Sequence, residues 1–258
     1  MKKKSFSFSD HLEITGIDGL PEIKEGDDLT SLFFSALKEK RMTLEDHDAI
    51  VFTSKIISKS EGRVVDFSDV KVSEEAERIA KETEKDPKIV QLILNEAKEI
   101  VRMMKNHIIV ETKHGFVCAN AGVDESNVEE GKAVLLPKDP QKSAEWLKKE
   151  IEAGSGKEIS VLISDSFGRA FRDGVTGACI GVSGIPALLD RRGEVDRFGK
   201  IAKITKEAIA DEICAAANLV MGEFKEGMPI VLVRGLKLER SESNIKEILF
   251  KKKDDLFR

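Results

Sequence analysis

Acidic and hydroxyl-bearing side chains gather in three separate segments of the chain. They are NAGVDESN with Asp124, Ser126 and Asn127, SDSFGR with Asp165 and Ser166, and MGEFKEGMP with Glu223 and Glu226. Each segment follows or leads into a predicted strand or helix. Carboxylate and hydroxyl oxygens are the ligands that Mg²⁺ prefers, together with water and substrate phosphates. Acids in such positions are also common as turn formers and helix caps. The three segments can therefore form a metal site only if the fold brings them together.

Basic side chains form a second set. Lys55 and Lys59 follow a predicted strand, with Arg63 shortly after, and Arg169 and Arg172 come directly after the SDS tripeptide. Ammonium and guanidinium groups beside a metal are what a nucleoside triphosphate site requires. The alternative is a solvated charged surface.

Familiar phosphate-binding and hydrolytic motifs are absent from the sequence. GSGKE at 154–158 is no P-loop, because Ile151 stands where a glycine is needed and Glu158 follows the lysine. The glycines at 174, 177, 181 and 184 do not have the GxGxxG spacing of a dinucleotide-binding motif. We expect them to permit tight turns or close backbone approach. There is no GxSxG elbow and no Cys/His pair for covalent catalysis. A nucleotide would need an unusual site.

Composition excludes several classes of protein. The 258 residues carry a net charge of −5, which argues against a nucleic-acid partner bound through a basic surface. The 3 cysteines include no CxxC pair, and the 4 histidines show no zinc-binding spacing. No apolar run approaches the ~20 residues of a membrane span, and the N-terminus lacks a signal peptide, so we expect a cytoplasmic protein with no membrane partner.

The predicted elements alternate irregularly between strand and helix. Strands are expected at 11–17, 48–54, 158–165 and 228–235, with a hairpin at 107–122 that turns at 113–115. Helices are expected at 28–40, 73–85, 86–104, 143–154, 205–222 and 243–258, the first capped by Asp27 or Asp28 and the third by Asp86 before Pro87. The pattern favours an α+β (mixed α/β) fold over a Rossmann-type sheet.

Seven ordered blocks of the chain resemble the coenzyme F-420 gamma-glutamyl ligases, GTP-dependent enzymes that extend the glutamate tail of a deazaflavin cofactor. The blocks are GLPEIKEGDDL, TSKIISKSEGR, NAGVDESNVEEG, SDSFGRAFRDGVTGACIGVSGI, RRGEVDRFGK, TKEAIADEICAAANLVMGE and MPIVLVRG. The resemblance implies a family-specific fold in which 1–258 form one ligase unit of two intertwined subdomains, working as a homodimer. Because the chain ends soon after VLVRGL, we expect no C-terminal flavin-reductase extension.

The resemblance also implies a set of site residues. The metal ligands fall on Asp124, Asp165, Ser166 and Glu223. The GTP contacts fall on Gly19, Leu20, Pro21, Glu22, Ser54, Lys55, Lys59, Asn127, Met221, Gly222, Glu223, Phe224, Lys225, Glu226, Gly227 and Met228. Asp165, Lys55 and Arg169 are the implied catalytic residues. Two features depart from the family: Ser166 stands where threonine is usual, and Phe224-Lys225 occupy a loop that is often smaller and richer in glycine.

The reaction that the resemblance implies forms an amide through an acyl phosphate. The acceptor carboxylate attacks the γ-phosphate of GTP, and the amine of L-glutamate then displaces phosphate. The resemblance also implies bound Mg²⁺ or Mn²⁺, two per subunit, and a K⁺ ion. Two alternatives stay open: ligation of glutamate to another acceptor such as a folate, and nucleotide binding without catalysis. The general base, the preference for GTP over ATP, the number of glutamates added and the roles of Arg169 and Arg172 also stay open.

Overall fold

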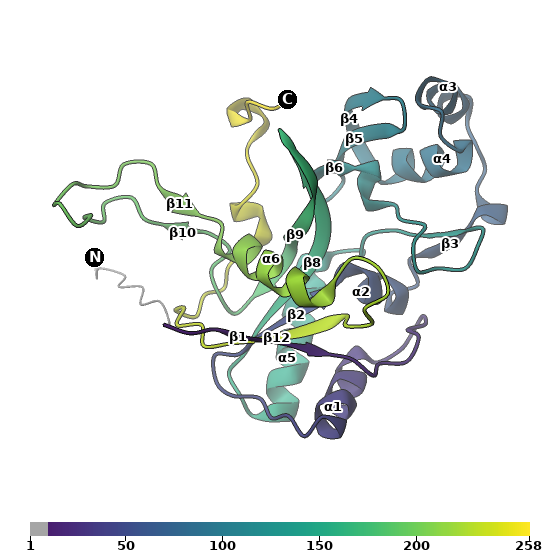
Figure 1. Ribbon diagram of the computed structural model, residues 1–258. Coiled ribbons are helices and arrows are strands. Elements are labelled where there is room, and N and C mark those ends of the chain that lie inside the picture. Colours follow the sequence, from purple (N-terminus) through teal and green to yellow (C-terminus); the bar gives the residue numbers. More distant parts are fainter. Residues whose placement is uncertain (1–9) are drawn as a thin grey trace.

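A five-stranded mixed sheet forms the centre of the computed structural model, which describes residues 10–258 (Figure 1). Its strand order is β1-β12-β2-β8-β9, in which β2 and β8 run parallel and all other neighbours run antiparallel. The strands are β1 (Glu13–Ile17), β12 (Ile230–Arg234), β2 (Ala49–Thr53), β8 (Ser160–Arg169) and β9 (Arg172–Ser183). The α+β prediction is confirmed.

Three helices pack around this sheet: α1 (Leu29–Glu39), α5 (Pro140–Ser155) and α6 (Ile209–Met221). Helix α6 contacts β9 and β12, and α5 contacts β8, β9 and α1. Two glycines of β9 allow this close packing: a Cβ on Gly177 would lie 2.5 Å from the Cys214 carbonyl oxygen, and one on Gly181 would lie 2.2 Å from that of Pro140. The expectation that these glycines serve close backbone approach is confirmed.

A second hydrophobic cluster is separate from the first and lies at the upper right in Figure 1. It is built by α3 (Glu74–Thr83), α4 (Pro87–Glu96) and the antiparallel sheet β4 (Ala97–Met104), β5 (His107–Thr112) and β6 (Val117–Ala119). Ile79, Ile93 and Val110 are fully buried in it, as Phe33 and Leu162 are in the first cluster. The division into two intertwined subdomains stays a prediction.

Short elements complete the described part of the fold. They are α2 (Ser54–Ser60), the paired strands β3 (Val64–Asp66) and β7 (Lys132–Val134), the projecting pair β10 (Leu189–Asp190) and β11 (Lys206–Glu207), and the 3₁₀ turns η1 (Phe67–Asp69), η2 (Asn120–Gly122), η3 (Ile245–Glu247) and η4 (Lys252–Asp254). Within residues 10–258, no helix is at once long enough and apolar enough to cross a bilayer.

Local signals located several element ends correctly. The Asp28 carboxylate accepts the N–H groups of Thr30 at 3.0 Å and Ser31 at 3.2 Å, so it is the N-cap of α1. The Asp86 carboxylate accepts the Lys88 N–H at 2.7 Å, with Pro87 in the first turn of α4. The hairpin of β5 and β6 turns at 113–115 as expected.

Three predicted helices are wrong in part. The helix expected at 86–104 ends at Glu96, because 97–104 pairs with β5 and satisfies its backbone in a ladder. Helix α6 begins at Ile209, since 206–207 belong to β11. The tail at 243–258 forms only the two short 3₁₀ turns η3 and η4.

Two further boundaries also need correction. Helix α5 begins at Pro140 and is closed by Gly156 (φ 66°), and the expected terminator Gly154 lies inside it. The strand expected at 158–165 continues to Arg169, so Ser166 as well as Asp165 lies within β8, because β9 continues the antiparallel ladder past them. Their partners there are Ala178 and Gly177.

Candidate active site

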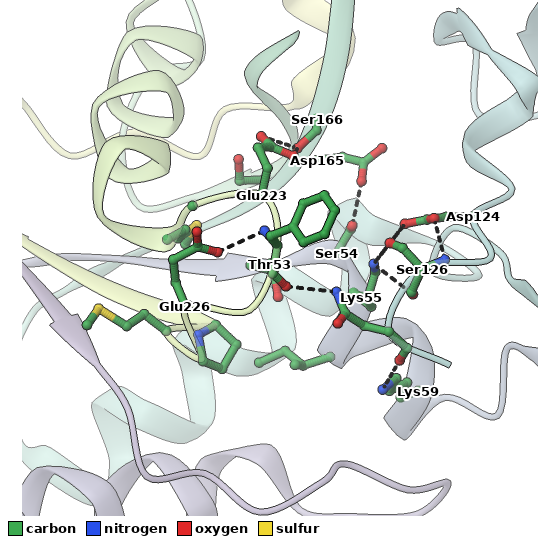
Figure 2. A pocket seen from close by; sticks show the side chains of 18 of the residues that line it. Thr53, Ser54, Lys55, Lys59, Asp124, Ser126, Asp165, Ser166, Glu223 and Glu226 are labelled. Carbon is green, nitrogen blue, oxygen red and sulfur yellow. Dashed lines mark hydrogen bonds and ion pairs between the residues drawn. The ribbon is translucent and has the colours of Figure 1, made fainter. Parts of the chain in front are cut away.

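One cleft of about 580 Å³ gathers almost all the predicted site residues (Figure 2). The sequence-predicted residues that line it are Leu20, Pro21, Glu22, Ser54, Lys55, Lys59, Asp124, Asn127, Asp165, Ser166, Met221, Gly222, Glu223, Phe224, Lys225, Glu226, Gly227 and Met228. Gly19 and Arg169 are outside this lining. The three acidic segments, which are far apart in the sequence, therefore converge on one cavity.

Asp165 meets Ser54 where the parallel pairing of β2 and β8 ends. Thr53 is the last residue of β2 and pairs with Ser164 of β8, so the next residues on the two segments, Ser54 and Asp165, lie beside each other. The Ser54 hydroxyl donates to the Asp165 carboxylate at 2.6 Å (Figure 2). Burial raises the pKa of Asp165 to about 6, against the smaller opposing effect of the Ser54 hydrogen bond. The site thus holds a carboxylate whose charge the protein alone stabilises poorly.

Asp124 is paired with a lysine on the other side of the cleft. The Lys55 ammonium lies 2.8 Å from the Asp124 carboxylate and donates to the Ser126 hydroxyl at 2.7 Å. Partial burial works to raise the pKa of Asp124, but hydrogen bonds from Lys55 and Ser126 outweigh it and hold the pKa below its usual value. Asp124 is therefore more readily ionised than Asp165.

Glu223 approaches from the end of α6. Gly222 (φ 68°) ends the helix and turns the chain. The Ser166 hydroxyl lies 2.8 Å from both oxygens of the Glu223 carboxylate, and the Asn218 side-chain amide donates to it at 2.8 Å. Asn218 also lines the cleft, and the sequence analysis missed it. A polar amide one turn from the end of a long, apolar-faced helix is the only feature of the sequence that could have indicated Asn218 as a site residue.

A hydrogen-bonded chain ties the remaining segments around the cleft. The Lys59 ammonium pairs with Glu22 and donates to the Asn127 carbonyl oxygen at 2.8 Å. The Asn127 side-chain amide donates to the Phe224 carbonyl oxygen at 3.1 Å, and the Phe224 N–H donates to Glu226 at 2.8 Å. The 221–228 loop is thereby held against the segment that carries Asp124.

Two predicted residues lie elsewhere. Gly19 precedes Leu20 with φ 85°, a left-handed conformation that glycine adopts without strain. The exposed Arg169 guanidinium donates to the Asp173 carbonyl oxygen at 3.3 Å, across the tip of its own hairpin. In this structure Arg169 thus contacts its hairpin turn and not the cleft.

The donor set of the cleft suits a hard divalent cation. It offers the three carboxylates of Asp124, Asp165 and Glu223 and the hydroxyl of Ser166, all oxygen donors. Asp165 has no ion pair among the described residues, so a cation beside it would favour its charged form. No three His, Cys, Asp or Glu side chains of residues 10–258 are grouped closely enough to hold an ion by themselves. Magnesium commonly takes one or two carboxylates and completes its shell with water and phosphate oxygens.

The cleft is rich in oxygen donors and flanked by lysines, and the fold that carries it has no P-loop or dinucleotide-binding motif. Its side chains suit a class of site in which a metal ion and an anionic ligand bind together. Comparison with known proteins gives the family. The F420-0:Gamma-glutamyl ligase family matches residues 18–235, and the chain belongs to it.

Three relatives resemble the chain over almost its whole length, and each carries the name coenzyme F420:L-glutamate ligase. The protein from Methanocaldococcus jannaschii is 49% identical over 247 residues, covering 96% of this chain and 97% of its own. The one from Methanothermobacter thermautotrophicus is 44% identical over 249 residues, covering 96% and 99%. The one from Archaeoglobus fulgidus is 43% identical over 247 residues, covering 96% of each chain.

Proposed function

We propose that this chain forms the amide bond between L-glutamate and the deazaflavin coenzyme F420 or its glutamate-free precursor, with GTP as the phosphoryl donor. One observation supports this most: the residues implied for GTP and metal, other than Gly19, all line a single cleft. The relatives' printed names supply the two substrates that are joined.

The proposed chemistry has two steps. An oxygen of the acceptor carboxylate attacks the γ-phosphorus of GTP, and the bond from that phosphorus to the GDP oxygen breaks. The glutamate amine nitrogen then attacks the acyl carbon, inorganic phosphate leaves with the carbon–oxygen bond electrons, and the nitrogen loses a proton. No residue of the cleft is assigned to take that proton.

The residues of the cleft would act by position and charge. Lys55 and Lys59 supply positive charge where two anions, a carboxylate and a triphosphate, must meet. Asp124, Asp165, Ser166 and Glu223 would hold Mg²⁺ or Mn²⁺, two per subunit, and the bound metal would neutralise charge on the phosphoryl oxygens. A further K⁺ site, an assisting role for Arg169 and a homodimeric assembly belong to the same proposal.

A mass spectrum of the reaction products tests this function. Purified protein with GTP, Mg²⁺, L-glutamate and the glutamate-free deazaflavin should give a product heavier by one or more glutamyl residues, with GDP and phosphate released. A parallel reaction with a folate acceptor should give none. Product only with folate would reject the acceptor, and absence of phosphate release with either acceptor would reject ligation.

A further inference from the structure

A second cavity, of about 420 Å³, lies beside the cleft and has no part in the proposed function. Phe116 and Ile180 belong to its lining. Ile180 is adjacent to Cys179, the ladder partner of Ser164, and Ser164 lines the cleft. Phe116 packs edge-on against Phe167 of β8, with ring centroids 6.2 Å apart. The two cavities are therefore neighbours that share the β8–β9 ladder.

Three ammonium groups at the second cavity are unpaired. Lys113, Lys138 and Lys246 line it and are exposed, and none of them forms an ion pair with any residue of 10–258. They come from three separate segments: the β5–β6 turn, the segment before α5, and η3. An anion entering the cavity would meet these unpaired ammonium groups.

The acids of the same cavity already have partners. The Glu96 carboxylate lies 2.7 Å from the Arg63 guanidinium, and Asp139 caps α5 by accepting the Lys142 N–H at 3.1 Å. Glu61, next to the wall, accepts the Lys138 N–H at 2.7 Å. These carboxylates are held in place by the protein, so the three lysines remain available to a ligand.

His114 adds a buried acceptor. Its Nε2 lies 3.1 Å from the Lys138 carbonyl oxygen, which can only accept, so Nε2 carries the hydrogen. Nδ1 is buried and has no hydrogen-bond partner in the described part of the chain, so a ring that carries its hydrogen on Nε2 alone offers a free lone pair there. The ring stacks on Phe116 with centroids 5.8 Å apart. A ligand with an N–H or O–H group would satisfy this acceptor.

The wall of the cavity is fixed by a buried amide. The Gln141 side chain donates to the Val182 carbonyl oxygen at 2.8 Å and to that of Ser243 at 3.3 Å, and accepts the Ile245 N–H at 3.1 Å. It thereby pins the segment before Lys246 onto β9. The segment that carries Lys246 is therefore held in place by the protein itself, without a ligand.

We infer that this second cavity binds a glutamyl group, with its carboxylates at Lys113, Lys138 and Lys246 and its N–H at His114. The inference rests on the proposed function, which supplies glutamate as a substrate. Free L-glutamate and a γ-linked glutamyl residue already on the acceptor share these groups, so either can be the source.

Direct binding without nucleotide tests the inference, because no turnover is then possible. The full-length protein is titrated by calorimetry with L-glutamate, with the acceptor bearing one γ-linked glutamate and with the glutamate-free acceptor. The double variant Lys138→Gln/Lys246→Gln should bind the glutamyl compound at least about tenfold more weakly than the wild type. Lys149→Gln, an exposed lysine of α5 outside the cavity, should bind as the wild type does.

A second variant separates folding from binding. His114→Phe keeps an aromatic ring against Phe116 and removes the Nδ1 acceptor together with the Nε2 donor to the Lys138 carbonyl oxygen. It should therefore weaken binding about threefold or more while lowering the thermal midpoint by only a few degrees. Lysine-dependent binding of L-glutamate identifies the free amino acid as the source. Lysine-dependent binding of the monoglutamyl acceptor alone identifies the growing tail.

Two outcomes overturn the inference. One is that both glutamyl compounds bind the double lysine variant as tightly as the wild type. The other is that inorganic phosphate alone binds in a lysine-dependent way and neither glutamyl compound does. Failure of the proposed function would appear separately, as intact lysine-dependent glutamate binding with no amide product in the mass spectrum.

Discussion

Asp165 differs from the other acids of the cleft in how its charge is supported. Asp124 has the Lys55 ammonium at 2.8 Å, and Glu223 accepts from a hydroxyl and an amide. Asp165 accepts from Ser54, but burial dominates and raises its pKa to about 6. The protein therefore keeps an acid that is costly to ionise at the point where a cation is proposed to bind.

The substitution Asp165→Asn should stabilise the ligand-free protein at neutral pH and abolish ligation. The folded-state pKa exceeds the unfolded value near 3.8, so ionisation lowers the free energy of unfolding progressively between about pH 4 and pH 6, and the loss is complete above pH 6. Removing that charge should add about 2 kcal/mol at pH 7.5, and the gain should shrink from pH 6 and vanish near pH 4. Urea unfolding at several pH values measures this.

Asp124→Asn is the matched control for that experiment. Because the pKa of Asp124 is lowered, its charge contributes stability that is present at neutral pH and lost as the pH falls through that lowered pKa. This half-buried pair, still in contact with solvent, should contribute about 1 kcal/mol or less. Equal effects of the two substitutions at pH 7.5 would contradict the contrast drawn between the two acids.

At the scale of elements, the strand pair β8 and β9 positions the site. Its ladder carries Asp165 and Ser166 past the end of β2, and its glycines let α5 and α6 approach closely. The same pair has Ser164 in the cleft and Ile180 in the second cavity. The geometry of both cavities therefore depends on how tightly the helices pack on β9.

Gly181→Ala should lower the free energy of unfolding by about 1–3 kcal/mol, because the new methyl group would lie 2.2 Å from the Pro140 carbonyl oxygen and force α5 away from β9. Gly168→Ala is the control, since its Cβ would meet no atom within 4 Å and its backbone is not in the left-handed region. It should change the free energy by less than about 0.5 kcal/mol. Urea unfolding of the two variants tests this prediction. An unfolding midpoint of Gly181→Ala equal to that of the wild type would refute the close packing of α5 on β9.

At the scale of the whole molecule, the cleft joins the two hydrophobic clusters. Ser54, Asp165 and Glu223 follow elements that pack in the first cluster, and Asp124 follows Val123 of the second. The Asn127–Phe224 and Lys59–Asn127 hydrogen bonds are direct links across the cleft. A ligand in the cleft should therefore stabilise both clusters together.

GDP with Mg²⁺ at about 100 times its Kd should stabilise the protein by about 2.7 kcal/mol and raise the thermal midpoint by roughly 5–10 °C. The Lys55→Gln/Lys59→Gln variant should lose most of this shift, and Lys149→Gln should keep it. Thermal unfolding by circular dichroism gives the midpoints, with ADP in parallel to rank the two purines. A full shift in the lysine double variant would place the nucleotide outside the cleft.

Short-range signals in the sequence were enough to locate many elements. Asp28 and the Asp86-Pro87 pair specify helix starts through contacts within three residues, and the apolar run 49–53 specifies a buried strand. The separate acidic segments and the lysines after β2 indicated a metal and phosphate site before any contact was known. The element predictions hold because capping and hydrophobic periodicity depend on residues close in sequence, whereas the metal and phosphate site stays a prediction.

Long-range hydrogen bonding determined the elements and contacts that local sequence patterns did not predict. Residues 97–104 have enough apolar character for a helix, yet pairing with β5 makes them a strand, and pairing with β9 extends β8 beyond Asp165 to Arg169. The Ser54–Asp165 contact, the Asn218–Glu223 contact and the second cavity join residues that no local pattern relates. The sequence by itself determined which groups could do chemistry and where most helices begin. The tertiary structure alone decided which of those groups meet, because backbone groups and charges leaving water take whichever partner the packed chain brings within reach.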